Sequence, residues 1–443
     1  MVADGLTNRE IGAKLFISER TVDGHLEHIR EKLGVNSRAQ VTAWLIRSDS
    51  GQTPSAGATV PAIRPRSRLI VHPTAWLAGA LVLGLLAATV GVLRLIEPPA
   101  PIIKTVVGCT TPARCLLADT QQPLAAALNN PTSIAVDSTG IIYIADFGHG
   151  RIVRVAGDVM TTIAGGGKEQ LKEGAFGRSV SSSSLGDAST IAVDAQDELD
   201  VLTNRADMLE LWRIDSAGFM HFVVLVGPGQ PGNGYFFAPN LPVGGLAITR
   251  DGVIFISDRA GNRVWRYPPR GPVTLYAGGG QDRFGDGGGA TSAQLNWPTA
   301  LALDSQENLL IADTGNHRIR QVDHLKGTIS TLAGDTEEFE GDRGDGGLAK
   351  RALLSFPMGV AVAPNGAVVI ADTGNNRLRE ISAGTIAALA GTGQVEYLGD
   401  GQPAAQAGLN APQALVLDHH GDLFILDNGN LRVREIPHLF GSG

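Results

Sequence analysis

Acidic residues flanked by glycine recur in three places along the chain. Asp286, Asp345 and Asp400 stand in the sequences GDGG, GDGG and GDG. Carboxylates gathered on the loops of one face would suit a cation or a polar ligand. Asp/Gly pairs are also ordinary turn residues, and we favour that interpretation. We therefore treat these three residues as candidates for a binding face, and we assign no metal ligand.

Residues that would signal catalysis are sparse in the sequence. The chain contains neither Gly-x-Ser-x-Gly nor His-Glu-x-x-His. We expect His149 and His317 to occupy equivalent hairpin positions and to belong to a repeated pattern rather than to a metal site. We therefore predict no catalytic residue, no cofactor and no enzyme activity.

The chain has two cysteines, Cys109 and Cys115. They could be two free thiols or one disulfide. We expect the disulfide, because we argue below that this part of the chain lies outside the cytoplasm. A zinc site is disfavoured, since two thiols without a nearby histidine do not complete a tetrahedral shell.

A repeated phrase shows which elements position these residues. It reads IADTGNHR from Ile311 and IADTGNNR from Ile370, and it returns with changes from Ile256, Ile144 and Leu426. Alignment on its aspartate gives steps of 58, 54, 55, 59 and 55 residues between Asp146, Asn204, Asp258, Asp313, Asp372 and Asp427. Six units of this length predict a propeller of six four-stranded blades.

One unit shows the expected strands. Residues 300–303 form the inner strand, 308–312 the second, 318–322 the third and 329–333 the outer strand. Outer strands recur at 161–165, 273–278 and 386–391, but the last unit ends at Ile436 without one. We predict that Lys104–Gly108 supplies the missing strand and closes the ring, which removes an exposed edge.

These repeats resemble NHL-repeat propellers over residues 104–443, although the unit around Asn204 lacks the signature. The blade-to-blade loops and the turns after the second strands should lie on one face. That face would carry the candidates Asp286, Asp345 and Asp400. We expect Asp313 and Arg318 to pair across their hairpin. Some six-bladed propellers are lyases or lactonases with a channel metal, but nothing in this sequence singles out such ligands.

A charge-free segment precedes the repeats. Ala75–Leu93 has 19 residues without a charge, long enough to cross a membrane as a helix. We therefore divide the chain into residues 1–48, a flexible linker at 49–73, a transmembrane helix at 74–96, a linker at 97–103 and the propeller at 104–443.

Charge distribution predicts the orientation. Arg64, Arg66 and Arg68 precede the segment, which places the N-terminus in the cytoplasm and the propeller outside. Residues 108–443 carry 24 basic and 36 acidic residues, so a role with nucleic acid belongs to the N-terminal region. Small residues at 80, 84 and 88 would allow two helices to approach as a homodimer. An ordinary Ala- and Gly-rich span is the equal alternative.

The first 48 residues have the outline of a helix-turn-helix. Residues 7–10, TNRE, form a capping box that opens a helix. Ser18 caps the next helix, whose apolar stripe is Val22, Leu26, Ile29 and Leu33, and Gly34 ends it. A further capping box, SRAQ at 37–40, opens a helix through Arg47.

This segment resembles the LuxR-type helix-turn-helix family, through GLTNREI at 5–11, ISERTV at 17–22, KLGV at 32–35 and SRAQ at 37–40. The resemblance implies that residues 18–33 enter the DNA major groove. By position, base edges would be faced by Asp23, Gly24 and Glu27, and phosphates by Thr21, Lys32 and Arg38. The acidic residues depart from the family's pattern and weaken phosphate attraction. The family's first helix is largely missing, and we expect the true start upstream of Met1.

The sequence therefore predicts a multi-domain protein: a small all-α helix-turn-helix, one transmembrane helix and an all-β six-bladed NHL-type propeller. Its expected function is a single-pass membrane transcription regulator, with a cytoplasmic DNA-binding module and an extracytoplasmic propeller that senses a ligand or protein. The alternative is an extracytoplasmic interaction scaffold with a non-functional DNA-binding module. A surface-tethered propeller enzyme is the weakest alternative.

Overall fold

The structure, a computed structural model, describes residues 100–441 apart from 110–114, 116–121, 168, 171–174, 177–182, 186, 206–207, 227–243, 282–283 and 336–339. The chain divides into two units, Met1–Glu97 and Pro98–Gly443. The expected helix-turn-helix, the linker and the apolar segment at 75–93 lie outside the described residues. Within residues 100–441, gaps excepted, no helix is long and apolar enough to cross a membrane.

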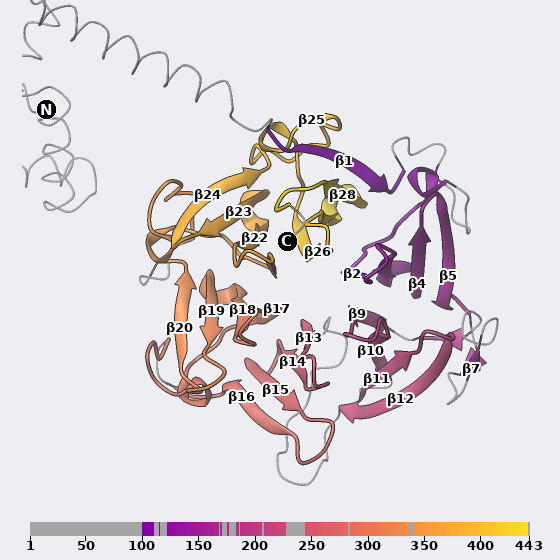
Figure 1. The fold of residues 1–443 in the computed structure, drawn as a ribbon, viewed down its shortest axis with the longest axis horizontal. Helices are drawn as coiled ribbons and strands as arrows, with labels where there is room; N and C mark the ends of the chain where they lie inside the picture. The colour runs from indigo at the N-terminus through magenta and orange to yellow at the C-terminus, as the bar shows by residue number, and fades with distance from the viewer. Residues whose placement is uncertain are drawn as a thin grey trace, which may run out of the picture. The chain divides into compact units, whose positions relative to one another are not determined.

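Six antiparallel sheets stand as blades around a common centre (Figure 1). Four of them have four strands each. These strands are β2 (Ser133–Val136), β3 (Ile142–Asp146), β4 (Arg151–Ala156) and β5 (Val159–Gly165); β13 (Leu246–Ile248), β14 (Ile254–Asp258), β15 (Arg263–Tyr267) and β16 (Thr274–Gly278); β17 (Pro298–Leu303), β18 (Leu309–Asp313), β19 (Arg318–Val322) and β20 (Ile329–Ala333); β21 (Gly359–Val362), β22 (Val368–Asp372), β23 (Arg377–Ser382) and β24 (Thr385–Ala390).

The two other blades gain an edge strand. The second blade holds β9 (Asp187–Val193), β10 (Leu199–Arg205), β11 (Met208–Ile214) and β12 (Phe219–Val226), with β7 (Ala175–Phe176) beside β12. The sixth holds β26 (Pro412–Leu417), β27 (Leu423–Asp427), β28 (Arg432–Ile436), β1 (Ile102–Val107) and β25 (Gln402–Pro403). A short parallel pair joins β6 (Glu169–Gln170) to β8 (Ser183–Ser184).

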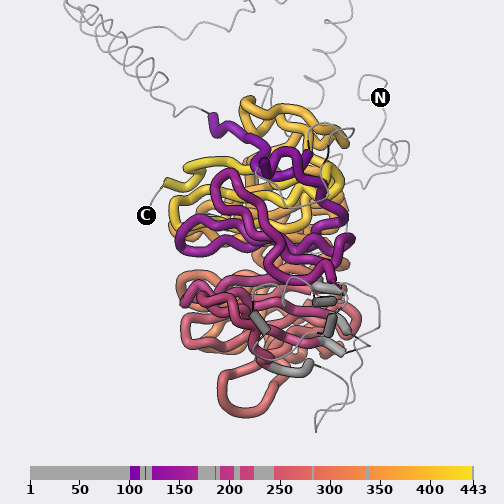
Figure 2. The backbone as a smooth tube through the Cα atoms, turned by 90° about the vertical axis from the view of Figure 1, so that its right-hand side faces the viewer, coloured from indigo at the N-terminus to yellow at the C-terminus, as the bar shows by residue number. Residues whose placement is uncertain are grey.

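The ring closes through its first strand, as predicted. β1 pairs antiparallel with β28, and Lys104 lies opposite Glu435. Figure 2 shows the same contact in another view, where the indigo start of the described chain lies beside the yellow C-terminal blade. The predicted strands at 318–322 and 329–333 match β19 and β20, and the other expected strands shift by one or two residues at their ends. Joining the two ends of the unit leaves no open edge between the first and last blades.

The hydrophobic core lies between neighbouring blades rather than in the centre. One cluster joins the third and fourth blades through Phe255, Val264, Leu309 and Ile311, and comparable clusters fill the other blade interfaces. Second strands such as β18 are buried along their whole length. A neighbour covers each face of a blade, which explains their continuous apolar runs.

Four second strands with the repeated phrase, β3, β18, β22 and β27, end in one tight turn, whereas the fifth, β14, is followed by an ordinary turn at 259–262. A short 3-10 helix follows each of the four, and the next residue adopts a left-handed conformation. These helices are η3 (Phe147–His149), η5 (Thr314–Asn316), η7 (Thr373–Asn375) and η9 (Asn428–Asn430). Their left-handed residues are Gly150, His317, Asn376 and Leu431. Four more 3-10 helices lie in the loops that lead into blades: η2 (Pro123–Ala125), η4 (Ala290–Ser292), η6 (Ala349–Arg351) and η8 (Ala404–Gln406).

Candidate functional site

The repeated aspartate fastens four of the six blades, the first, fourth, fifth and sixth, to the loop before each of them. Asp313 Oδ1 accepts a 2.7 Å hydrogen bond from the backbone N–H of Asn296, in the loop that leads into the blade. Its Oδ2 accepts a 2.9 Å bond from Asn316 Nδ2. The corresponding partners, at 2.7 to 2.9 Å, are Asn129 and His149 for Asp146, Ser355 and Asn375 for Asp372, and Asn410 and Asn430 for Asp427. The face that we predicted from strand order therefore does bring these loops and turns together.

The glycine of each turn allows this close approach. A Cβ at Gly315 would lie 2.6 Å from Cγ of Asn296, and one at Gly374 would lie 2.4 Å from Oγ of Ser355. A side chain at either position would push the loop away from the turn.

The two histidines are not equivalent, contrary to our expectation. His149 Nδ1 lies 2.8 Å from Asp146 Oδ2, so His149 takes the place of Asn316. His317 stands one residue later, in the left-handed position, and its Nδ1 accepts a 3.1 Å bond from the backbone N–H of Phe356. In the first blade, the left-handed position is occupied by Gly150. His149 and His317 therefore occupy neighbouring positions of the turn rather than the same one.

Our expected pairing of Asp313 with Arg318 was also wrong. The two residues are opposite in the ladder, but the ion pair of Asp313 is with Arg320, at 3.5 Å. Residues two apart share a face of a strand, so Arg320 reaches the same carboxylate diagonally. The Arg318 guanidinium lies instead 3.5 Å from the ring centroid of Phe284. In the first blade, Val153 takes the place of Arg320, and Arg151 does pair with Asp146, at 2.9 Å.

The three candidate aspartates lie against buried arginines near the outer strands. Asp286 lies 2.6 Å from Arg320, Asp345 2.7 Å from Arg379, and Asp400 2.8 Å from Arg434. All three arginine side chains are fully buried, whereas the carboxylates are 36 to 40% exposed. The Gly-Asp-Gly loops occur only before the three blades that carry Arg-x-Arg in their third strand. Each buried arginine therefore links its own blade's Asp313, Asp372 or Asp427 to the preceding loop.

Burial also changes the titration of the clamping aspartates. Desolvation raises the pKa of Asp313 and of Asp372 to about 6, against the opposing effect of their hydrogen bonds and of Arg320 and Arg379. Both carboxyl groups therefore remain ionised at neutral pH.

A central cavity of about 410 Å³ opens where the blades meet. This size is within the range of small-molecule sites. Backbone and side chains from all six blades line it, at the turn-and-loop face. The lining residues are Asn130, Thr132, Ser133, Phe147, Thr190, Gly244, Gly245, Arg259, Trp297, Thr299, Ala300, Met358, Gln413 and Ala414.

Hydroxyl groups tie the rim of this cavity from one blade to the next. Ser133 donates to the carbonyl oxygen of Ile191 at 3.3 Å, and Thr190 to that of Gly244 at 2.8 Å. Thr299 donates to the carbonyl oxygen of Met358 at 2.9 Å. The wall is therefore held in place before any ligand arrives.

Arg259 is the charged residue of this lining. It is 9% exposed, and its Cζ lies 4.5 Å from the ring centroid of Trp297. Desolvation lowers the pKa of Arg259 to about 10, so the guanidinium stays cationic at neutral pH. Trp297 is 39% exposed and leaves part of its ring accessible.

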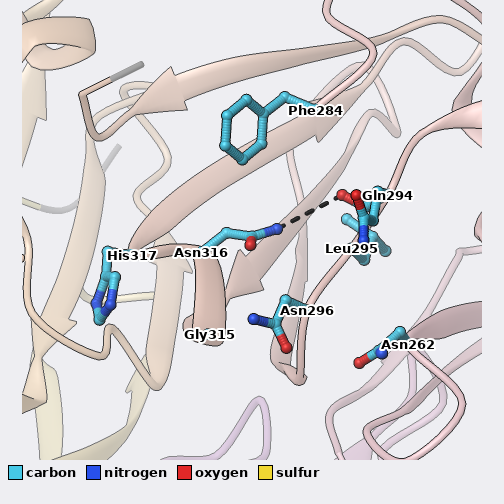
Figure 3. Close-up of a pocket in the computed structure, with 8 residues that line it drawn as sticks. All are labelled: Asn262, Phe284, Gln294, Leu295, Asn296, Gly315, Asn316 and His317. Atoms are coloured by element: carbon cyan, nitrogen blue, oxygen red, sulfur yellow. Dashed lines mark hydrogen bonds between the residues drawn. The ribbon is translucent and has the colours of Figure 1, made fainter. Parts of the chain in front are cut away.

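A second pocket, of about 380 Å³, lies between the turns of the third and fourth blades. Figure 3 shows its amide-rich wall, where Asn316 reaches the backbone oxygen of Gln294 at 3.5 Å. Asn262 Oδ1 accepts a 2.7 Å bond from the N–H of Trp297, which connects this pocket to the rim of the central cavity. Its amides hold neighbouring loops together, so this pocket has a clear structural role.

Comparison with known families assigns the repeats. The NHL repeat model matches residues 128–154, 295–322 and 354–381. Three of the six blades, the first, fourth and fifth, therefore match NHL repeats. A second model, described as "Bacterial regulatory proteins, luxR family", matches residues 1–45. The chain thus combines a LuxR-type DNA-binding region with an NHL propeller.

Individual relatives are distant. The chain is 27% identical to "Protein SUPPRESSOR OF QUENCHING 1, chloroplastic" of Arabidopsis thaliana over 41% of its own length and 18% of the relative's. It is 27% identical to "NHL repeat-containing protein 2" of Gallus gallus over 59% and 40%. A solved structure of a protein of unknown function from Bacteroides thetaiotaomicron matches 76% of each chain, with 18% identity and a TM-score of 0.57. The chain therefore spans less than half the length of these two sequence relatives, and the solved structure supports the fold alone.

The remaining site predictions fall at the start of the chain. Cys109 and Cys115 form a disulfide with a Cα–Cα distance of 5.4 Å, next to β1 of the NHL propeller. The predicted DNA-contacting residues lie outside the described residues, namely Thr21, Asp23, Gly24, Glu27, Lys32 and Arg38. Where the structure describes the chain, no group of three or more His, Cys, Asp or Glu is placed to hold a metal ion.

Sequence reasoning missed the buried arginines and the Arg259–Trp297 pair. The buried arginines could have been recognised from the sequence, because each Arg-x-Arg in a third strand follows a Gly-Asp-Gly loop. The sequence indicates Arg259 more weakly, since it stands where the turns of the fourth and fifth blades have threonine.

Proposed function

We propose that this protein is a membrane-anchored transcription regulator whose NHL propeller senses a ligand or protein outside the cytoplasm. The observation that carries the proposal is the joining of a luxR-family match at residues 1–45 to a propeller, with the charge-free residues 75–93 between them. A single helix would cross the membrane there, with Arg64, Arg66 and Arg68 on the cytoplasmic side.

The disulfide gives separate support for the location of the propeller. Cys109 and Cys115 are bonded near the start of the propeller. Such bonds persist in oxidising compartments and are rare in the cytoplasm. A signal that enters the propeller would then reach DNA through a change in how two cytoplasmic modules pair, because one helix has few other ways to transmit it.

A topology assay and a reporter test this function together. Treatment of intact cells with a membrane-impermeant protease should degrade the propeller and leave the N-terminal region intact. A reporter gene controlled by the regulator's operator should change its response when residues 104–443 are deleted. If the propeller is protected from the protease, the proposed membrane orientation is wrong. If the reporter responds in the same way without residues 104–443, the proposed sensing role is wrong.

A second candidate function is an extracytoplasmic protein-interaction scaffold. Large apolar side chains stand exposed on the turn-and-loop face, where Trp297, Phe356 and Leu431 are 39 to 42% exposed. Such residues are typical anchors at protein interfaces. This scaffold would require no DNA binding, so operator binding by the full chain in a gel-shift assay distinguishes it from the regulator.

A further inference from the structure

We propose that the pocket between the third and fourth blades binds a sugar ring, a neutral ligand with several hydroxyl groups, through four carboxamide side chains and the ring of Phe284. The carboxamides belong to Asn262, Gln294, Asn296 and Asn316. This inference rests on the proposed function for its role, because it names the class of ligand that the propeller would sense. The binding itself depends only on the geometry of the pocket.

The pocket is polar but uncharged. Among the described residues that line it, no side chain is a carboxylate, a guanidinium or an ammonium group. Its single titratable side chain is His317, and burial lowers the pKa of that imidazole below its usual 6.5, so it is neutral at neutral pH. A charged ligand would lose water here without meeting an opposite charge, which is unfavourable. The volume of about 380 Å³ suits a small molecule, so the pocket favours a small, neutral, polar ligand.

The carboxamides match the hydrogen-bonding pattern of a sugar. Each carboxamide offers N–H donors beside a carbonyl acceptor, and each sugar hydroxyl both donates and accepts, so two neighbouring hydroxyls satisfy one carboxamide. Asn262 Oδ1 accepts the backbone N–H of Trp297, which orients the side chain and leaves its Nδ2 group as a donor. Asn316 Nδ2 donates to Asp313 and to the backbone oxygen of Gln294, which leaves its Oδ1 as an acceptor.

The fold makes no use of the two other carboxamides. Gln294 and Asn296 are exposed, and neither side chain has a hydrogen-bond partner among the described residues. The counterpart of Asn296 in the first blade, Asn129, does donate to the carbonyl oxygen of Gly148, at 3.1 Å. At the position of Gln294, the first, fifth and sixth blades have Ala127, Leu353 and Gly408. The repeat therefore gives no structural reason for a glutamine there.

Phe284 supplies an apolar surface for the sugar ring. Its φ of 55° is left-handed, which is unusual for a bulky residue, and the corresponding Arg343 and Leu398 of the next two Gly-Asp-Gly loops do not share it. Strained residues of this kind gather at functional sites. The ring is partly exposed and stands above the carboxamides in the view of Figure 3. The weakly positive C–H groups on one side of a sugar ring pack well against the negative face of an aromatic ring.

Binding is tested on the purified full-length chain in a detergent without a sugar head group. The probes are the methyl glycosides of glucose, galactose and mannose, detected by saturation-transfer NMR. At least one should bind, and tetrahydropyran methanol, a similar ring without the ring hydroxyls, should bind about 10- to 100-fold more weakly, the effect of two neutral hydrogen bonds. The affinity should be the same at about 50 and about 500 mM salt, because no charge contributes.

The decisive variant is Gln294→Leu/Asn296→Ser, which gives the pocket the residues of the fifth blade, Leu353 and Ser355. Since the repeat accepts these residues, the variant should keep the wild-type urea midpoint and bind the glycoside at least about 10-fold more weakly. The matched control is Gln306→Leu, in an exposed turn of the fourth blade outside the pocket, which should bind the glycoside like the wild type.

Four results would overturn the inference. They are no glycoside bound at about 50 mM, an unchanged affinity in Gln294→Leu/Asn296→Ser, equally tight binding of tetrahydropyran methanol, and binding of N-acetylglycine methylamide in place of every glycoside. The last result would assign the carboxamides to a peptide backbone.

A sugar ring reaches the propeller either free or as the end of a glycan chain. A disaccharide that ends in the bound sugar separates these sources. Tighter binding of the disaccharide than of the methyl glycoside assigns the pocket to a chain end, whereas equal or weaker binding assigns it to a free sugar. Either result supports the ligand class.

The reporter separates this inference from the proposed function. Glycoside binding that depends on Gln294 and Asn296, with a reporter that responds in the same way without the propeller, supports the ligand class and shows that the sensing role is wrong. A propeller-dependent reporter without glycoside binding supports the sensing role and overturns the ligand class.

Discussion

The buried arginine of the fifth blade offers the sharpest test of how the propeller is held together. Arg379 is fully buried and pairs with Asp345 at 2.7 Å and with the equally buried Asp372 at 3.3 Å. We consider the substitution Arg379→Met, which keeps most of the side-chain volume and removes the charge.

The expected cost follows from what the substitution leaves behind. Asp372 would stay buried without its cation, and removal of one partner from a buried ion pair costs about 3 to 5 kcal/mol. An exposed pair of the same length provides the comparison. Lys326 lies 2.7 Å from Asp323 with side chains 74% and 33% exposed, so Lys326→Met should cost at most about 1 kcal/mol.

The measurement is urea unfolding of the full-length chain, followed by the fluorescence of the buried Trp212 and Trp265. Arg379→Met should lower the free energy of unfolding by at least about 2 kcal/mol more than Lys326→Met. Asp345→Asn should fall between them, because its carboxylate is partly exposed and Arg379 keeps Asp372. Equal costs for Arg379→Met and Lys326→Met would refute the argument that burial decides the strength of these pairs.

Two further predictions concern His317 and the closing strand. Burial lowers the pKa of His317 below its usual 6.5, so the unfolded chain takes up the proton first as the pH falls. The wild type should therefore lose stability relative to His317→Asn from about pH 6.5 downward through the folded pKa, measured as the difference between their urea midpoints. The asparagine should keep the hydrogen bond from the backbone N–H of Phe356, because Asn262 and Asn376 accept the equivalent backbone N–H at 2.7 and 2.8 Å. A difference between the two urea midpoints that does not change with pH would contradict the lowered pKa of His317. In β1, Ile103→Ala should cost about 2 to 4 kcal/mol because Ile103 is fully buried, whereas Ile102→Ala at the half-exposed neighbour should cost under about 1 kcal/mol. Equal urea midpoints for these two variants would mean that β1 does not close the core.

The architecture was readable from the sequence because it is repeated. The spacing of the repeated phrase predicted six blades, and the missing outer strand after Ile436 predicted closure by Lys104–Gly108. Both follow from local requirements: each blade needs four strands, and an unpaired edge must be covered. The shared face of the turns and the blade-to-blade loops followed from strand order in the same way.

The side-chain partners needed the tertiary structure. The sequence alone determined that Asp313, Asp345 and Arg379 recur with their repeats, but it did not determine which side chains form pairs. The same strand register allows Asp313 to contact Arg318 directly opposite or Arg320 diagonally. The loop that leads into the blade determines the partners. Its Asp286 pairs with Arg320, whereas its Phe284 lies against the guanidinium of Arg318. The central cavity has the same origin. Its lining comes from six blades that are far apart in the chain, so only the closed ring brings Arg259 and Trp297 to one site.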